Sequence, residues 1–128
     1  MNFSTTKEKG RAGLSAAIAY FGMNGYTVSI PVNDTQDYDL VVDLNNELQK
    51  VQCKSTGAKT KTGQYKVKLE TWGGQYGGTR YSQVKSSSAH LLFILTENKK
   101  MYLIPVKDIT QSTQLILNDT YNKYEVFF

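Results

Sequence analysis

Residues 36–54, QDYDLVVDLNNELQKVQCK, contain side chains that could bind a metal ion and assist phosphate chemistry. Asp39 begins an apolar run, and Gln52 and Lys54 lie two apart on a second run that follows the pair Asn45–Asn46. A carboxylate and an amide oxygen are ligands that Mg²⁺ accepts, together with waters and substrate phosphates. An ammonium group beside them could orient water and stabilise the charge that builds on a phosphate.

A two-residue turn at Asn45–Asn46 would bring these side chains together. Asparagine tolerates the positive φ that such a turn requires. With this turn, Asp39 lies opposite Gln52, and Lys54 follows on the same face. A loop of three or five residues would instead place these side chains on opposite faces of the hairpin. Polar residues are also common on the solvent-exposed face of an ordinary hairpin. Asp43 lies roughly 13 Å along the strand from Asp39, which is too far to share an ion.

One helix and several strands are predicted to position this hairpin. Residues 6–23 have apolar and small residues at helical spacing, and Thr5 with Glu8 three residues later has the spacing of a capping box. Strands are predicted over 26–30, 39–44, 47–54, 63–72, 90–95, 99–104 and 123–128. A helix followed by strands in meander order indicates an α+β domain, with the helix packed on a mixed sheet and the hairpin at its centre.

Composition limits the class of protein. The chain has 128 residues, 40% of them hydrophobic, which suits a single domain over residues 1–128. The single Cys53 cannot form an internal disulfide, so we expect a reducing, cytoplasmic compartment. No apolar run approaches the roughly 18 residues of a membrane helix, and no signal-peptide pattern begins the chain. We therefore expect no membrane partner.

Charge is distributed unevenly along the chain, whose net charge is +4. The ionisable residues between positions 34 and 47 are all acidic, whereas eight basic residues and one acid lie between positions 50 and 85. An acidic site bordered by a basic surface suits a metal-dependent enzyme that acts on a polyanion. A solvated sheet face and loop is the alternative explanation.

The segment YDL, followed by QCK, resembles the signature of the PD-(D/E)XK nucleases, with Gln52 in place of the usual second acid. The stretch KGRAGLSAAIAYFGMNGYTVSIPVNDTQDYDLVVDLNNELQKVQCKST and the later KMYLIP are similar to the group I intron-encoded homing endonucleases of that superfamily, which carry a Q-x-K third motif. The resemblance implies a restriction-endonuclease-like α/β nuclease core. It also implies Mg²⁺, with Mn²⁺ as a substitute, and site-specific hydrolysis of phosphodiester bonds in double-stranded DNA.

The resemblance also implies roles for individual residues. Asp39, Gln52 and Lys54 become the catalytic residues, and the metal ligands are Asp39, Gln52 and the backbone carbonyl of Cys53. Members of the family often add an acid from the first helix. Glu8 is the only acid there, so it is a candidate catalytic residue and metal ligand as well as a candidate helix cap.

The partner expected from the resemblance is double-stranded DNA. Cleavage of both strands by one small domain implies a homo-oligomer, either a dimer or a tetramer. The alternatives are a catalytically inactive DNA-binding module with the same fold, or a junction-resolvase or restriction-type nuclease, because the core does not fix the substrate. His90 is expected to be a strand-end polar residue, with general base as the alternative. The expected DNA-contact residues are Lys59, Lys61, Lys66, Lys68, Arg80 and Lys85.

Overall fold

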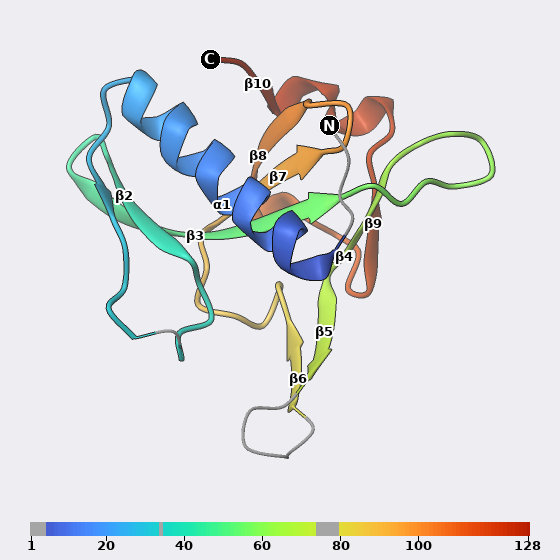
Figure 1. The fold of residues 1–128 in the computed structure, drawn as a ribbon, viewed down its shortest axis with the longest axis horizontal. Helices are drawn as coiled ribbons and strands as arrows, with labels where there is room; N and C mark the ends of the chain where they lie inside the picture. The colour runs from blue at the N-terminus through green and yellow to red at the C-terminus, as the bar shows by residue number, and fades with distance from the viewer. Residues whose placement is uncertain (1–4, 34, 74–79) are drawn as a thin grey trace.

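Within the described residues, a six-stranded mixed sheet with one long helix across it forms the centre of the molecule (Figure 1). The computed structural model describes residues 5–33, 35–73 and 80–128, without the side chains of residues 6, 71–73 and 80–82. The strands follow one another across the sheet in the order β1 (Val28–Ser29), β2 (Leu40–Leu44), β3 (Glu47–Thr56), β7 (Leu91–Thr96), β8 (Met101–Pro105) and β10 (Glu125–Val126). β3 and β7 are parallel, and the other neighbouring pairs are antiparallel. The predicted α+β fold is confirmed.

The helix α1 (Thr6–Met23) forms where the sequence predicts it. Thr5 caps its start, because the Thr5 Oγ1 accepts a hydrogen bond of 3.1 Å from the Glu8 N–H. The helix lies across one face of the sheet (Figure 1), where Ala17 and Phe21 are completely buried. Burial of this face against the strands supplies the stability that an isolated helix of this length would lack.

The β2–β3 hairpin has the predicted two-residue turn. Asn45 and Asn46 both have positive φ, at 53° and 68°, as a type I′ turn requires. The strands pair in the predicted register as far as Leu40 opposite Val51. Asp39, predicted to begin the first strand, instead immediately precedes β2.

The segment between β3 and β7 differs most from the sequence prediction. The strand predicted over 63–72 is two strands, β4 (Lys66–Lys68) and β5 (Glu70–Gly73). β4 pairs with β9 (Gln114–Ile116), and β5 pairs with β6 (Arg80–Gln83). These strands lie outside the six-stranded sheet, so the predicted meander order is wrong for this part of the chain. The β5–β6 hairpin projects away from that sheet (Figure 1).

Leu69 is the point at which the predicted strand divides. Its N–H donates a hydrogen bond of 2.9 Å to the Thr113 carbonyl, and its carbonyl accepts one of 2.9 Å from the Val84 N–H. The residue is completely buried. The chain therefore changes its pairing partner at Leu69, from β9 to β6. The alternation of polar and apolar residues continues through Leu69, so it does not reveal this change.

Two apolar clusters lie on the two faces of the sheet. The cluster under α1 includes Phe21 and Phe93. The cluster on the opposite face includes Ile94 and also contains residues of β4, β9 and the 3₁₀ helices η1 (Val106–Asp108) and η2 (Asp119–Tyr124). β7 contributes side chains to both clusters, so the central strand joins the two halves of the core. The 3₁₀ helices and β10 occupy the tail, where β10 covers only part of the strand predicted over 123–128. At the other edge, β1 covers only part of the predicted strand 26–30.

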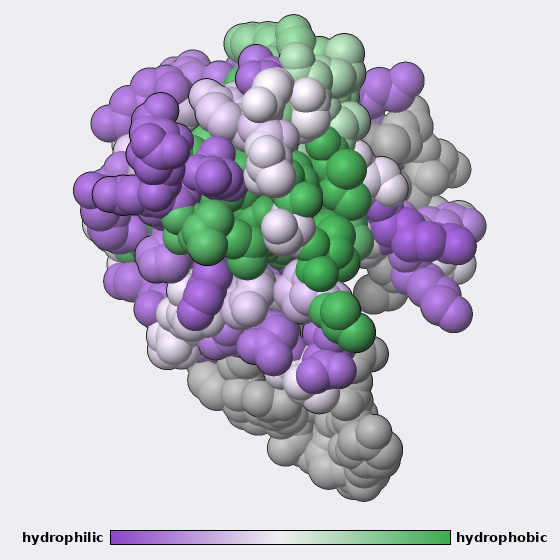
Figure 2. Space-filling view, turned by 90° about the vertical axis from the view of Figure 1, so that its left-hand side faces the viewer, coloured by the Kyte–Doolittle hydropathy of each residue, from purple (hydrophilic) through white to green (hydrophobic). Residues whose placement is uncertain are grey.

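Apolar side chains also gather on the surface. Figure 2 shows such an area, surrounded by polar side chains, on the side of the molecule where the β2–β3 turn lies in Figure 1. Large apolar side chains exposed on the described part of the chain include Ile18, Met23, Leu48 and Phe127. Apolar areas of this kind suit contact with another protein surface. No helix among the described residues has the length and apolarity needed to cross a bilayer.

α1 approaches β3 closely at Gly13. A Cβ at this position would collide with the Ser55 Oγ and lie 3.4 Å from the Lys54 carbonyl oxygen. The Ser55 hydroxyl donates a hydrogen bond of 2.6 Å to the Lys9 carbonyl, one helical turn before Gly13. The absent side chain at Gly13 therefore makes room for a polar contact between the helix and the strand.

We expect Gly13→Ala to lower the free energy of unfolding by about 1–3 kcal/mol, because overpacking at Ser55 outweighs the helix preference of alanine. In a Ser55→Ala background the colliding oxygen is gone, so Gly13→Ala should cost less or become stabilising. Urea denaturation of wild type, Gly13→Ala, Ser55→Ala and the double variant measures this difference. Gly10→Ala is the matched control, because a Cβ there meets no atom within 4 Å. An equal cost of Gly13→Ala in both backgrounds would contradict this packing.

Candidate active site

The predicted site residues lie at the edge of β3 where its pairing with β2 ends. Leu40 opposite Val51 is the last pair of that ladder, whereas β3 continues beside β7 through residues 52–56. The Asp39 N–H donates a hydrogen bond of 2.8 Å to the Val51 carbonyl. The Asp39 Oδ2 then accepts one of 2.7 Å from the Cys53 N–H. A carboxylate therefore takes the place of the next backbone acceptor at this edge.

Gln52 and Lys54 project from the face of β3 that is opposite α1. Their neighbours Val51 and Cys53 pack into the cluster under the helix, and side chains alternate between faces along a strand. The Gln52 Oε1 is buried and has no hydrogen-bond partner among the described residues. Leaving a buried polar atom unpaired costs about 1–3 kcal/mol. An electropositive ligand beside this oxygen would remove that cost.

Loss of water around the site changes the pKa values of both ionisable groups. Asp39 is exposed as a residue, but neighbouring atoms crowd its carboxyl group. This burial raises the carboxyl pKa, although the Cys53 N–H and the Lys54 charge oppose the change. Burial lowers the pKa of Lys54, and the Asp39 charge opposes that change. The attraction between the two groups only partly offsets the loss of water, so a cation beside Asp39 would be favourable.

Cys53 offers its backbone rather than its thiol to a ligand. Burial, and then the Asp39 charge, raise the pKa of the Cys53 thiol well above its ordinary range. A thiol that stays protonated is a poor metal ligand. The N–H and C=O of one strand residue point to the same strand edge. Because the Cys53 N–H donates to Asp39, the Cys53 carbonyl also points to the edge beyond the end of β2.

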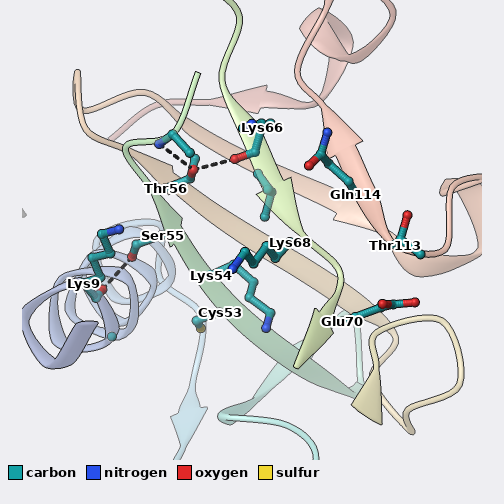
Figure 3. A pocket seen from close by; sticks show the side chains of 13 residues that line it. Lys9, Cys53, Lys54, Ser55, Thr56, Lys66, Lys68, Glu70, Thr113 and Gln114 are labelled. Atoms are coloured by element: carbon teal, nitrogen blue, oxygen red, sulfur yellow. Dashed lines mark hydrogen bonds between the residues drawn. The ribbon is translucent and has the colours of Figure 1, made fainter. Parts of the chain in front are cut away.

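An open cleft of about 810 Å³ borders this part of β3 (Figure 3). The first turn of α1 lines one side of it through Lys9, and β4 lines the other side through Lys66 and Lys68. Lys54 lies between these two sides (Figure 3). The structure thus places two of the predicted DNA-contact residues beside the predicted catalytic lysine.

Three of the four remaining predicted DNA-contact residues do not line the cleft. Lys59 and Lys61 are exposed on the loop between β3 and β4, and the Lys59 Nζ lies 5.0 Å from the centre of the Tyr65 ring. Lys85 is exposed in the segment after β6 and does not line the cleft. Arg80 begins β6, but its side chain lies outside the described part of the structure.

Two charged residues that line the cleft, Lys9 and Glu70, were not among the site residues predicted from the sequence. Lys9 has a detectable signal, because Lys9, Gly13 and Ala17 are spaced four apart and therefore lie on one helix face. Glu70 also lines the cleft. It reaches this position because the chain changes partners at Leu69, and the alternating pattern of the sequence does not reveal that change.

Glu8 and His90, the two other candidates, have clear backbone contacts. Glu8 is half-buried in the first turn of α1, and its N–H is capped by Thr5. The Nδ1 of His90 accepts a hydrogen bond of 3.0 Å from the Lys50 N–H, while the His90 N–H donates one of 2.9 Å to the Lys50 carbonyl. His90 thus extends the β3–β7 pairing by one step, which is the role of a strand-end residue.

The segment before Asp39 is held by contacts on both sides of the sheet edge. The Asp37 carboxylate accepts hydrogen bonds from the Ser88 N–H, at 2.9 Å, and from the Ser88 hydroxyl. The Lys50 Nζ lies 5.2 Å from the centre of the Tyr38 ring, within the range of a cation–π contact. Asp37 and Tyr38, the two residues before Asp39, are thereby connected to the segment that precedes β7 and to β3.

Comparisons with known proteins agree with the resemblance found in the sequence. A family model described as PD-(D/E)XK endonuclease matches residues 4–126. Among solved structures, a bacterial homing endonuclease, I-Ssp6803I, matches with a TM-score of 0.75 and 29% sequence identity. The match covers 94% of this chain and 82% of that chain. A comparison with curated protein sequences gives no match.

The Asp37–Ser88 contact predicts a pH-dependent stability. Hydrogen bonds from the Ser88 side chain and backbone lower the pKa of the Asp37 carboxyl. A carboxyl group whose pKa is lower in the folded protein stabilises the fold at pH values above its pKa in the unfolded chain, which is near 4. This stabilisation is lost as the pH falls through the pKa of the folded protein. We expect wild type to exceed Asp37→Asn in free energy of unfolding by about 1 kcal/mol or less at pH 7, because the group is exposed.

Urea denaturation of wild type and Asp37→Asn across acidic and neutral pH measures this difference. The difference should shrink below about pH 4, where the unfolded carboxyl is protonated. Ser88→Ala is the control background, since the effect of Asp37→Asn should be smaller there. A difference that stays constant with pH would contradict the ionic contribution of Asp37.

Proposed function

The chain belongs to the PD-(D/E)XK endonuclease family, and from this premise we propose that it is a metal-dependent endonuclease that hydrolyses double-stranded DNA. The buried Gln52 Oε1, without a partner among the described residues, carries the proposal. It lies on the strand that also bears Lys54, next to the Cys53 N–H that binds Asp39. Because a matching structure is that of a homing endonuclease, we propose cleavage at specific DNA sites.

The donor atoms at the edge of β3 fit a small, hard cation such as Mg²⁺ or its substitute Mn²⁺. Asp39, Gln52 and the Cys53 carbonyl all offer oxygen, the element that such ions prefer. Among the described residues, His, Cys, Asp and Glu form no group of three that could hold a metal ion. Mg²⁺ tolerates so small a protein shell because it retains waters and binds substrate phosphates. Glu8 is proposed as an additional ligand from α1.

Each residue of the proposed site has a distinct task. When bound, the ion would stabilise charge on the phosphate and acidify a water molecule. Asp39 and Gln52 would hold it, with the Asp39 carboxylate fixed by the Cys53 N–H. Lys54 is proposed to hydrogen-bond a phosphate oxygen and to orient the attacking water. As the oxygen of that water bonds to phosphorus, the bond to the leaving oxygen breaks, the water releases a proton to solvent, and the leaving oxygen takes up a proton from solvent.

We also infer a homo-oligomer, either a dimer or a tetramer. One site of this kind cuts one strand at a time, so a double-strand break requires a second copy. The apolar area in Figure 2 is a candidate surface for contact between subunits. A cytoplasmic location is proposed because Cys53 is a free thiol.

Lys54→Ala tests the catalytic assignment. We expect it to reduce the rate of plasmid cleavage in Mg²⁺ by about 100-fold or more, because removal of one group that stabilises transition-state charge typically costs that much. Lys107→Ala, at an exposed lysine in η1, should cleave like wild type. Equal rates for wild type and Lys54→Ala would show that Lys54 does not take part in cleavage. DNA binding without cleavage by wild type would favour the inactive DNA-binding module.

Gln52→Leu tests the metal site independently of cleavage. Leucine removes the unpaired buried oxygen, so the metal-free protein should keep its stability or gain about 1 kcal/mol. The same substitution should abolish the rise in melting temperature that Mn²⁺ gives to wild type. Gln49→Leu is the control on the same strand and should retain the Mn²⁺ effect. A Mn²⁺ effect that survives in Gln52→Leu would mean that Gln52 is not a ligand.

A further inference from the structure

The two sides of the cleft are attached to β3 in the same way. The Ser55 hydroxyl donates a hydrogen bond of 2.6 Å to the Lys9 carbonyl on α1. The Thr56 hydroxyl donates one of 2.5 Å to the Lys66 carbonyl at the start of β4. Figure 3 shows these two contacts on opposite sides of the cleft. Two consecutive strand residues therefore fix the backbones of two lysines that line the same cleft as Lys54.

The side of the cleft formed by α1 is held in place by packing as well as by the hydrogen bond. Gly13 leaves the space that the Ser55 Oγ occupies, since a Cβ there would collide with it. The Lys9 carbonyl is the one that the Gly13 N–H bonds in a regular helix, so Ser55 adds a donor from outside the helix. The first turn of α1 is thus tied to the strand residue next to Lys54.

The charge of the cleft identifies the kind of ligand that it suits. Its ionisable lining residues other than Cys53 are four lysines and one glutamate: Lys9, Lys54, Lys66, Lys68 and Glu70. Cations at several points along one surface are what binding to a phosphate backbone requires. The N-terminal turn of α1 adds the positive end of the helix dipole on the side of Lys9.

We propose that Lys9 binds a DNA phosphate beside the one that is cleaved, and that Ser55 is the positioning residue that holds Lys9 in the cleft. Gly13 provides the space for this contact. The inference extends the proposed function, because it names a further DNA contact of the same site. It assigns to α1 a part in binding the substrate that does not depend on whether Glu8 binds the metal ion.

Binding to a fluorescein-labelled duplex of mixed sequence, in EDTA and at several salt concentrations, tests the role of Lys9. Lys9→Ala removes one phosphate contact, so it should weaken binding several-fold and reduce the magnitude of the slope of log affinity against log salt concentration by about 0.9. Lys7→Ala is the matched control, because Lys7 is exposed two residues earlier on the same helix and does not line the cleft. Lys9→Arg, which retains the charge, should restore the slope.

Ser55 is tested by a double-mutant cycle with Lys9. Ser55→Ala should weaken DNA binding in the wild-type background and have little effect in Lys9→Ala, because it acts through Lys9. Circular dichroism confirms that each variant is folded. An equal loss in both backgrounds, or a salt slope in Lys9→Ala that matches Lys7→Ala, overturns this inference alone. A wild-type protein that neither binds nor cleaves duplex DNA overturns the proposed function together with it.

Discussion

The structure depends on a difference in length between two paired strands. β3 extends past the last residue of β2 that pairs with it, and residues 52–56 keep β7 as their bonded neighbour. Backbone groups at such an edge need other partners. The Asp39 carboxylate supplies one at Cys53, and the cleft occupies the space beside the edge. The acid is consequently fixed by the sheet itself rather than by a mobile loop, as a precise site requires.

The same edge holds groups whose burial is unfavourable for the folded protein. The Gln52 Oε1 is buried without a donor among the described residues, and Asp39 and Lys54 each lose hydration that the other only partly replaces. Proteins commonly accept such local costs where they bind ligands. Here the Asp39 carboxylate and the Gln52 Oε1 are both oxygen groups that favour a cation. One metal ion would therefore suit both oxygen groups at once.

The hairpin was predictable because its determinants are local. Asn45 and Asn46 specify the turn, and the turn fixes which residues face one another. The family signature identified Asp39, Gln52 and Lys54 as site candidates, and the structure places them around one strand edge. The change of partner at Leu69 depends on residues distant in sequence, so alternation could not reveal it. The burial of the Gln52 Oε1 and the place of Lys9 in the cleft likewise follow from packing that forms only in the folded chain.

The parallel pairing of β3 with β7 requires a long connection between the two strands. The chain leaves the central sheet after Thr56 and returns at Leu91, and the six predicted DNA-contact residues all lie in this excursion. Asp39, Gln52 and Lys54 lie before it. This excursion is not a free loop, because Val67, Leu69 and Val84 within it are buried in the apolar cluster that also contains Ile94 of β7. Under the proposed function, most of the proposed DNA contacts and the proposed cutting residues therefore occupy separate stretches of one chain that are joined through a shared core.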